Sequence, residues 1–264
     1  MKFGIGQATL RLEDRRLLKG AGCYSDDVAP GQGLRVAFFR APYAHARLRH
    51  LDVGAARMLD GVRLVATQAD LDADKIGDIK CQYRPRLING GKMQLVSKPA
   101  MVRDINRYAG DIVVMVVADT QEIADDALEH IDAQFDPMPV VTDVYAAIAD
   151  GAPQLYEDYP KNIAFEWGIG AGEAVEQAMQ TALANGCRAV DVDLVNNRIV
   201  INSLETRPIV ASPGATEGTL DIWCGTQGVV GIAEQIASAL SMDIADVRVR
   251  SGDVGGSFGF KIFL

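Results

Sequence analysis

Hydrophobic and polar residues recur with two different spacings along the chain, so the sequence predicts both strands and helices. Alternation at every second residue, or a short apolar run, is typical of strands, whereas apolar residues three and four positions apart indicate an amphipathic helix. The strand-type stretches are residues 34–38, 61–66, 112–118, 162–167, 189–194, 198–201, 219–224 and 247–250. The helix-type stretches are residues 119–132, 173–185 and 229–240.

Individual residues in these stretches sharpen the prediction. Leu34, Val36 and Phe38 alternate with less apolar neighbours, which predicts a half-buried strand. Thr120 is a suitable N-cap for the helix that follows it, because its hydroxyl can accept a hydrogen bond from a free backbone N–H. Gly186 suits the position just after a helix end, where a left-handed backbone is common.

A domain boundary is predicted near the middle of the chain. Pro137 and Pro139 interrupt the pattern, and residues 143–163 combine short helical pieces with turn residues, as a linker does. A new alternation of helix and strand signals begins beyond them. We therefore expect two domains, residues 1–140 and residues 141–264.

Composition and charge exclude several classes of protein. Of the 264 residues, 48 % are apolar and 23 % are charged, as in an ordinary globular protein. The net charge of −9, with no basic block, argues against a nucleic-acid partner. The four cysteines and three histidines show no metal-ligand or disulfide-scaffold spacing, and the most apolar run, residues 112–118, is far shorter than the ~20 residues of a membrane span. No signal-peptide run precedes the charged residues 11–16, so we expect a cytoplasmic protein without a membrane span.

The first of two glycine clusters contains Gly168, Gly170 and Gly172 between a strand signal and a helix signal. Such a turn directs helix N–H groups at a pyrophosphate in dinucleotide-binding proteins. Here Glu173 stands at the third glycine of that pattern, and its carboxylate would repel phosphate. The residues therefore favour a plain strand–turn–helix connection over a dinucleotide site.

The second cluster is Gly-Gly-Ser-Phe-Gly at residues 255–259. Its glycines would allow the backbone to approach a ligand, with Phe258 as a wall of the site. The alternative, which composition alone favours, is a tight turn whose phenylalanine packs in the core. Gln227 lies between a strand and a helix, where side chains are often presented to ligands. By itself it is equally compatible with a solvated loop.

Motifs along almost the whole chain resemble the large, molybdenum-binding subunit of the xanthine dehydrogenase/aldehyde oxidase family, the molybdenum hydroxylases. Three of them carry the resemblance in the second half. They are Asn-Ser-Leu-Glu-Thr-Arg at 202–207, Trp-Cys-Gly-Thr-Gln at 223–227, and the cluster at 255–259 followed by Lys261. In the first half the similar segments are residues 11–14, 20–27, 40–47 and 108–118. Asp60 departs from the family by standing where proline is usual.

The resemblance implies an α+β fold. Residues 1–140 would form an α/β hammerhead domain like that of the family. Residues 141–264 would form the first part of a molybdopterin-cofactor-binding α/β domain. This reading makes the chain similar to the N-terminal part of the large subunit.

The resemblance also implies a reaction and a cofactor. Family members oxidise an aldehyde, an N-heterocycle or a similar small molecule, with water as the oxygen source, at a molybdenum–molybdopterin cofactor that we expect in its cytosine dinucleotide form. By similarity, Gln227 would approach the oxo ligand of the metal. The other expected cofactor contacts are Gly255, Gly256, Phe258 and Gly259, with Phe258 near the metal. Phe258 and Ile262 would border the substrate. Purine-oxidising members carry glutamate at the position of Ile262, so we expect a substrate other than a purine.

Other chains would complete such an enzyme. The resemblance implies iron–sulfur clusters and FAD on partner subunits, and a remainder of the large subunit that supplies the general-base glutamate. No catalytic residue is therefore expected within these 264 residues. The end of the sequence three residues after Lys261 favours a truncated product over a naturally split subunit. The alternative function is a catalytically inert, cofactor-free fragment, or an assembly module that needs a second chain.

Overall fold

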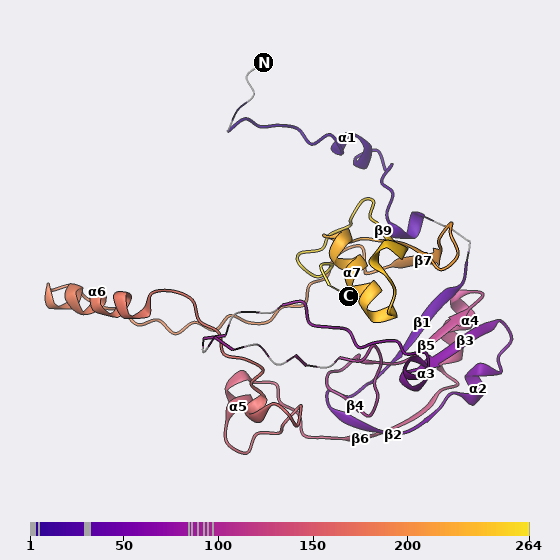
Figure 1. Cartoon of the computed structure of the whole chain (residues 1–264), viewed down its shortest axis with the longest axis horizontal. Coiled ribbons are helices and arrows are strands. Elements are labelled where there is room, and N and C mark those ends of the chain that lie inside the picture. Colours follow the sequence, from indigo (N-terminus) through magenta and orange to yellow (C-terminus); the bar gives the residue numbers. More distant parts are fainter. Residues whose placement is uncertain are drawn as a thin grey trace. The chain divides into compact units, whose positions relative to one another are not determined.

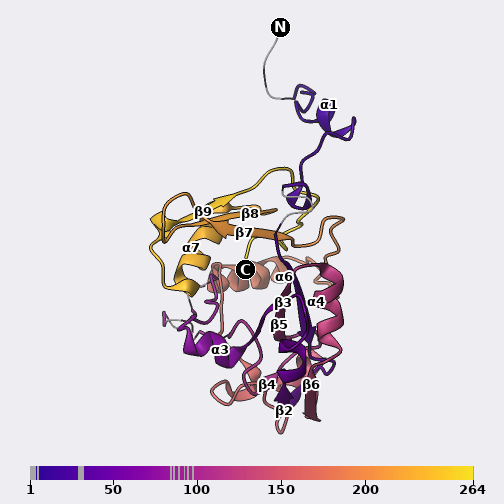
Figure 2. The same ribbon diagram turned by 90° about the vertical axis from the view of Figure 1, so that its right-hand side faces the viewer.

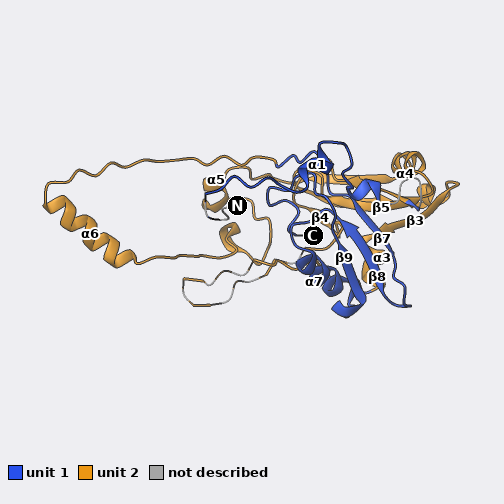
Figure 3. Ribbon diagram, turned by 90° about the horizontal axis from the view of Figure 1, so that it is seen from above, with its two compact units in different colours: residues 1–34, 75–77, 201–264 blue, residues 35–74, 78–200 orange. Residues whose placement is uncertain are grey.

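The computed structural model, drawn in two views in Figure 1 and Figure 2, forms two compact units. It describes residues 4, 6–28, 33–83, 85, 87–88, 90–91, 93, 95–96 and 98–263. The first unit comprises residues 1–34, 75–77 and 201–264, and the second comprises residues 35–74 and 78–200, as Figure 3 shows by colour. The N-terminal residues thus belong to the same compact unit as the C-terminal ones.

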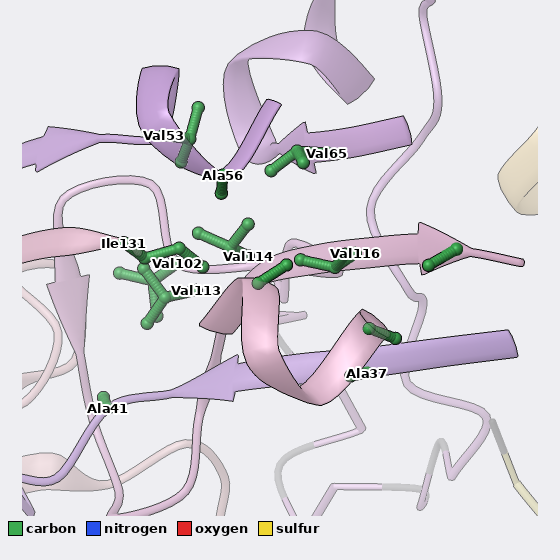
Figure 4. Packing of buried hydrophobic residues seen from close by; sticks show 13 residues of the cluster. Ala37, Ala41, Val53, Ala56, Val65, Val102, Val113, Val114, Val116 and Ile131 are labelled. Carbon is green, nitrogen blue, oxygen red and sulfur yellow. The ribbon is translucent and has the colours of Figure 1, made fainter. Parts of the chain in front are cut away.

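A three-stranded antiparallel sheet forms the core of the second unit. Its strands, in order across the sheet, are β1 (Arg35–Arg40), β5 (Ile112–Ala118) and β3 (Val62–Thr67). The middle strand is a continuous apolar run because it is buried on both faces, and its Val113, Val114 and Val116 are fully buried. Helix α4 (Gln121–Leu128) packs on β1 and β5, and helix α2 (Gly54–Arg57) packs on β3 (Figure 4).

A second antiparallel sheet in this unit has the order β4 (Ile105–Asn106), β2 (Ala46–Asp52), β6 (Asp132–Pro137). The unit's other helices are α3 (Gln68–Ala73), α5 (Val144–Ile148), α6 (Gly172–Ala184) and the 3₁₀ turn η2 (Pro160–Asn162). The strands β2 and β6 were not predicted from the sequence. Both nevertheless alternate: in β6 Ala133 and Phe135 are half-buried between exposed polar residues, and in β2 the alternation shifts at the irregularity between Leu48 and His50.

The inward face of β1 differs from the predicted one. Ala37 is buried and Phe39 packs against the core, whereas Val36 and Phe38 remain 41 % and 39 % exposed. Small Ala37 faces the core because helix α4 lies close to the strand there. The alternation itself was predicted correctly, but hydrophobicity alone pointed to the wrong side.

The helix predicted over residues 119–132 is shorter than expected. Thr120 is its N-cap, as predicted, and accepts a hydrogen bond from the Ile123 N–H. The helix ends at Leu128, and strand β6 already begins at Asp132. Ile131 is buried from the intervening turn, so its side chain contributed to the apparent helical spacing without being helical.

The first unit contains a sheet of three strands, β7 (Ile209–Pro213), β8 (Leu220–Cys224) and β9 (Val247–Arg250), in that order. The last two are parallel and are connected through helix α7 (Val229–Leu240), which packs against them. The core residues are Ile222, Cys224, Ile232, Ala233, Ile236, Ala237 and Val247. The shorter elements are α1 (Asp14–Leu17), η1 (Ser25–Asp27) and η3 (Ile244–Asp246). Helix α7 and strands β8 and β9 confirm the sequence prediction.

Two predicted strands do not form. Helix α6 confirms the helix expected at residues 173–185, but residues 189–194 and 198–201 have no strand partner among the described residues. Val190, Val192 and Leu194 are 68–83 % exposed. A β-type sequence becomes a strand only when another strand supplies its hydrogen bonds, and the described part of the chain places no strand beside these residues. The strand expected before the first glycine cluster is likewise reduced to a single bridge between Leu87 and Trp167.

No helix in the described part of the chain is long and apolar enough to cross a membrane.

Candidate functional site

The second glycine cluster forms a loop with an unusual backbone. It follows β9, and Gly256, Phe258 and Gly259 have φ angles of +96°, +50° and +89°. Phe258 is the exception among these, because a residue with a Cβ rarely adopts positive φ and such residues gather at functional sites. Its side chain is 77 % exposed. The alternative in which this phenylalanine packs into the core is therefore wrong.

The structure brings Gln227 to this loop. Gln227 lies between β8 and α7, and its Oε1 accepts hydrogen bonds from the Ser257 hydroxyl and, over 3.0 Å, from the Gly259 N–H. Its Nε2 has no acceptor among the described residues. The Gln227 Nε2 group can therefore donate a hydrogen bond to a ligand beside the loop. Gln227 and Gly259, two of the cofactor contacts predicted from the sequence, are thus in direct contact although 32 residues separate them.

A buried ion pair lies beneath the loop. Lys261 Nζ donates to Glu205 Oε2 over 2.6 Å, and the two side chains are only 1 % and 9 % exposed. The Glu205 carboxylate also accepts the N–H of Gly255 over 2.9 Å and that of Ser25 over 3.2 Å. Burial alone raises the pKa of Glu205, but these hydrogen bonds outweigh it and bring the pKa below its usual value.

Sequence reasoning did not place Glu205, Ser257 or Lys261 among the expected cofactor contacts. Glu205 was visible only as the acidic residue of the 202–207 motif, and Lys261 as the lysine after the glycines. A charged pair separated by 56 residues has no periodicity that would reveal it. The motif spacing was the available signal, and it marks the pair without showing that the two side chains meet.

The N-terminal segment is tied to the start of the same loop. The two terminal guanidinium nitrogens of Arg16, Nη1 and Nη2, donate to the Asp253 carboxylate, the second over 2.6 Å. The Cys23 N–H donates to Asp253 over 2.7 Å, and the Asp253 N–H donates to the Cys23 carbonyl over 3.1 Å. The hydrogen bonds from Arg16 and Cys23 lower the pKa of Asp253 to about 2. This segment therefore helps to hold residues 253–255 in place.

Glycine is present at the different positions of the loop for different physical reasons. A Cβ on Gly255 would lie 2.4 Å from Glu205 Cβ, so this position needs glycine for packing. A Cβ on Gly259 would meet no atom within 4 Å, which leaves open space beside its backbone. The N–H groups of Gly255 and Gly259 already donate to Glu205 and Gln227. Those of Gly256 and Phe258 have no acceptor among the described residues.

Phe258 and Ile262, the residues predicted to border the substrate, are both exposed in this structure. Ile262, next to Lys261, is 39 % exposed. A cavity of about 60 Å³ beside the loop is too small for most ligands, since ligand pockets usually measure ~300–1,000 Å³. Its lining includes Cys224 and Lys261 but neither Phe258 nor Ile262. Within this chain, both side chains are therefore exposed, and neither lines this cavity.

The first glycine cluster has a simpler environment. Gly170 has a φ angle of +122°, and the chain turns there into α6, where Glu173 occupies the first turn. A carboxylate at the positive end of a helix dipole is favourable without any ligand. The structure therefore agrees with a turn into a helix at this cluster.

Comparison with protein families identifies the two halves of the chain. Residues 19–139 match the model of the aldehyde oxidase and xanthine dehydrogenase a/b hammerhead domain. Residues 155–264, which include Gln227 and the glycine loop, match that of the molybdopterin cofactor-binding domain. The chain belongs to the xanthine dehydrogenase/aldehyde oxidase family. Its fold class, a hammerhead domain and a cofactor-binding domain with mixed helices and sheets, is the predicted one.

Relatives of this family align with nearly the whole chain. The nicotine 6-hydroxylase large subunit of Paenarthrobacter nicotinovorans is 31 % identical over 97 % of the chain and 30 % of its own length. The carbon monoxide dehydrogenase large chain of Afipia carboxidovorans is 31 % identical over 98 % of the chain and 32 % of its own length. The crystal structure of quinoline 2-oxidoreductase from Pseudomonas putida 86 superposes with a TM-score of 0.79 at 29 % identity, covering 99 % of the chain and 32 % of its own. The chain thus spans about a third of the length of these relatives.

Proposed function

We propose that the chain provides the hammerhead domain and the cofactor loop of the molybdenum-binding subunit of a hydroxylase. The enzyme would oxidise a small molecule and take the inserted oxygen from water. The observation that carries this proposal is the contact of Gln227 with Ser257 and Gly259. It leaves an amide donor and nearby backbone donors that have no acceptor among the described residues. A loop of this kind offers preorganised hydrogen bonds to charge on a bound group.

The side chains and backbone of the loop fit a molybdenum–molybdopterin cofactor. Its oxygen ligands, sulfur atoms and pterin ring are rich in hydrogen-bond acceptors, and the available groups here are donors: Gln227 Nε2 and the N–H groups of Gly256 and Phe258. The open space beside Gly259 permits a flat ring to approach the backbone. When bound, the cofactor supplies the two-electron oxidation–reduction chemistry. Gln227 would then hold an oxygen ligand of the metal, and Phe258 would exclude water from it.

The substrate class follows from the residue after the motif lysine. Ile262 has no group that hydrogen-bonds a purine ring, so we propose an aldehyde or an N-heterocycle. The names of two relatives, the nicotine hydroxylase and the quinoline oxidoreductase, support an N-heterocycle. The cytosine dinucleotide form of the cofactor is part of the same proposal.

The proposed enzyme needs more polypeptide than this chain. The relatives are about three times longer, and some are named as subunits of complexes. The apolar side chains within residues 189–200 are exposed and have no strand partner among the described residues, as expected if further large-subunit strands cover them. We propose that this remainder also supplies the general-base glutamate, and that iron–sulfur and FAD subunits accept the electrons. The four free cysteines are consistent with a cytoplasmic complex.

Native purification tests this proposal directly. The tagged chain is isolated from its source cells, and co-purifying chains are identified by mass spectrometry, while molybdenum, iron, flavin and released cytosine nucleotide are quantified. We expect about one molybdenum per chain, with quinoline or nicotine oxidation and no robust xanthine turnover. A Gln227→Ala variant is expected to lose most of the activity. Molybdenum-free protein without partners would overturn the proposal in favour of an inert fragment or assembly module.

A further inference from the structure

Lys261 is the centre of a hydrogen-bond network that joins separated segments of the first unit. Its ammonium group donates to Glu205, and its backbone N–H donates to Ser257 Oγ over 3.0 Å. Its carbonyl accepts the Thr226 hydroxyl over 2.7 Å and the Gln227 N–H over 3.2 Å. Every polar group of this residue is therefore engaged, and the side chain is 1 % exposed.

The network permits one orientation of the Gln227 amide. The Gly259 N–H can only donate, so the amide atom that lies 3.0 Å from it is the oxygen. Ser257 Oγ accepts the Lys261 N–H, which leaves the hydroxyl proton to donate to the same Gln227 oxygen. Two donors thus hold Oε1 against the loop. Nε2 lies on the side of the amide away from them.

The Glu205 carboxylate accepts hydrogen bonds from both ends of residues 255–261. Glu205 accepts the Gly255 N–H at the start of residues 255–261 and the Lys261 ammonium group at their end. The Glu205 N–H also donates to the Gly255 carbonyl over 3.1 Å. Residues between these two ends include Ser257 and Gly259, the two donors to Gln227. Loss of the carboxylate charge would therefore release the segment that orients the amide.

We propose that the buried Glu205–Lys261 ion pair is a positioning device that orients Gln227 Nε2 toward the cofactor by fixing residues 255–261. This inference rests on the proposed function, because it assumes a cofactor beside the loop. In this proposal, neither Glu205 nor Lys261 would contact the cofactor directly. They act through Ser257 and Gly259.

Hydrogen exchange in the full-length purified protein, read residue by residue, tests the proposal. The probe is the Gly259 N–H, and the reference is the Ile222 N–H in the core strand β8. We expect Glu205→Gln to speed exchange at Gly259 at least tenfold more than at Ile222, whose own change reports any loss of global stability. Glu234→Gln, the same substitution on the exposed face of α7, is the matched control and is expected to change neither. Equal acceleration at both amides would show a purely structural role and overturn the proposal.

A double-mutant cycle tests whether the pair acts through Ser257. Ser257→Ala alone is expected to speed exchange at Gly259, and to add less than threefold when Glu205 is already glutamine. Independent, multiplicative effects would overturn the proposal. The double variant Glu205→Gln/Lys261→Met removes both buried charges and therefore avoids an unpaired one. It is expected to fold and to show the same fast exchange at Gly259, whereas wild-type exchange there would contradict the proposal.

The molybdenum-loaded complex gives a second readout. We expect Glu205→Gln to retain its molybdenum, to alter the electron paramagnetic resonance signal of Mo(V), and to lower kcat while KM changes less than twofold. An unchanged signal and kcat would overturn the positioning role. The two proposals fail separately. A wild-type complex without molybdenum removes the proposed function even if Gly259 responds to Glu205→Gln, and a loaded complex whose Gly259 is indifferent removes only the positioning device.

Discussion

Two glycine-rich turns, at residues 168–172 and 255–259, lie in different surroundings. The first leads into α6, a helix without a single buried residue. The second is held by hydrogen bonds to Glu205 and Gln227, and it is followed by the buried Lys261, which pairs with Glu205. Both turns contain three glycines within five residues. The difference is that polar side chains from distant segments hold the second turn.

This difference shows what turns a glycine loop into a candidate site. Glycine lowers the steric cost of a left-handed backbone, but it also increases the freedom that folding must remove. A fixed loop therefore needs anchors, and buried charge-assisted hydrogen bonds are strong ones. Residues 255–259 have such anchors at both ends, whereas none is seen at residues 168–172 among the described residues.

Among changes at the two turns, the largest loss of stability is expected from breaking the ion pair that anchors the second turn. Lys261→Met leaves the Glu205 carboxylate buried without its cation, and such a loss costs about 3–5 kcal/mol of unfolding free energy. Glu173→Gln, at the start of α6, removes an exposed charge beside the first turn and is expected to cost less than ~1 kcal/mol. Urea denaturation of both variants measures the difference. Equal losses would show that the two turns are held alike.

The next largest difference in stability between the two turns is expected when alanine replaces a glycine in each of them. In Gly255→Ala the new Cβ would lie 2.4 Å from Glu205 Cβ, and overpacking of this kind costs about 1–3 kcal/mol. In Gly172→Ala, at the first residue of α6, the Cβ meets no atom within 4 Å, and the less flexible unfolded chain is expected to stabilise the protein by about 0.4–1 kcal/mol. Thermal midpoints of the two variants should therefore move in opposite directions. A rise for Gly255→Ala would contradict the packing described at Glu205.

The anchoring of the second turn by the N-terminal segment should depend on pH. The folded pKa of Asp253, about 2, lies below the ~3.9 of an unperturbed aspartate. Its contribution to stability is therefore complete above pH ~4 and is lost as the pH falls toward about 2. We expect the thermal midpoint of Asp253→Asn to lie below that of the wild type at pH 6, and the gap to narrow between pH 4 and pH 2. A constant gap would contradict this role of Asp253.

The smallest change in stability is expected from a substitution in residues 189–201, which follow the first turn and α6. Val192 is 68 % exposed, so Val192→Lys is expected to change the unfolding free energy of this chain by less than ~0.5 kcal/mol. The same substitution at Val116, which is fully buried in β5, provides the contrast and should prevent normal folding of the second unit. Circular dichroism melting curves compare the two. A large loss for Val192→Lys would show that this segment is packed in solution.

Local pattern determined several elements of the fold. The valine run of β5, the Thr120 cap of α4 and the apolar stripe of α7 were all predicted from neighbouring residues. Motif order along the chain was also sufficient to indicate the family, and it directed attention to Gln227 and the second glycine cluster. These are properties that a few adjacent residues carry.

Tertiary structure decided the rest. It showed that Ala37 rather than Val36 faces the core, because a helix lies close to the strand. It left residues 189–201 without a strand, because strand pairing needs a partner that these residues cannot supply for themselves. It joined Glu205 to Lys261 across 56 residues, since a buried charge is stable only where its counter-charge meets it. The sequence by itself determined local structure and family, and the packing of distant segments determined which loop is held in a form able to bind.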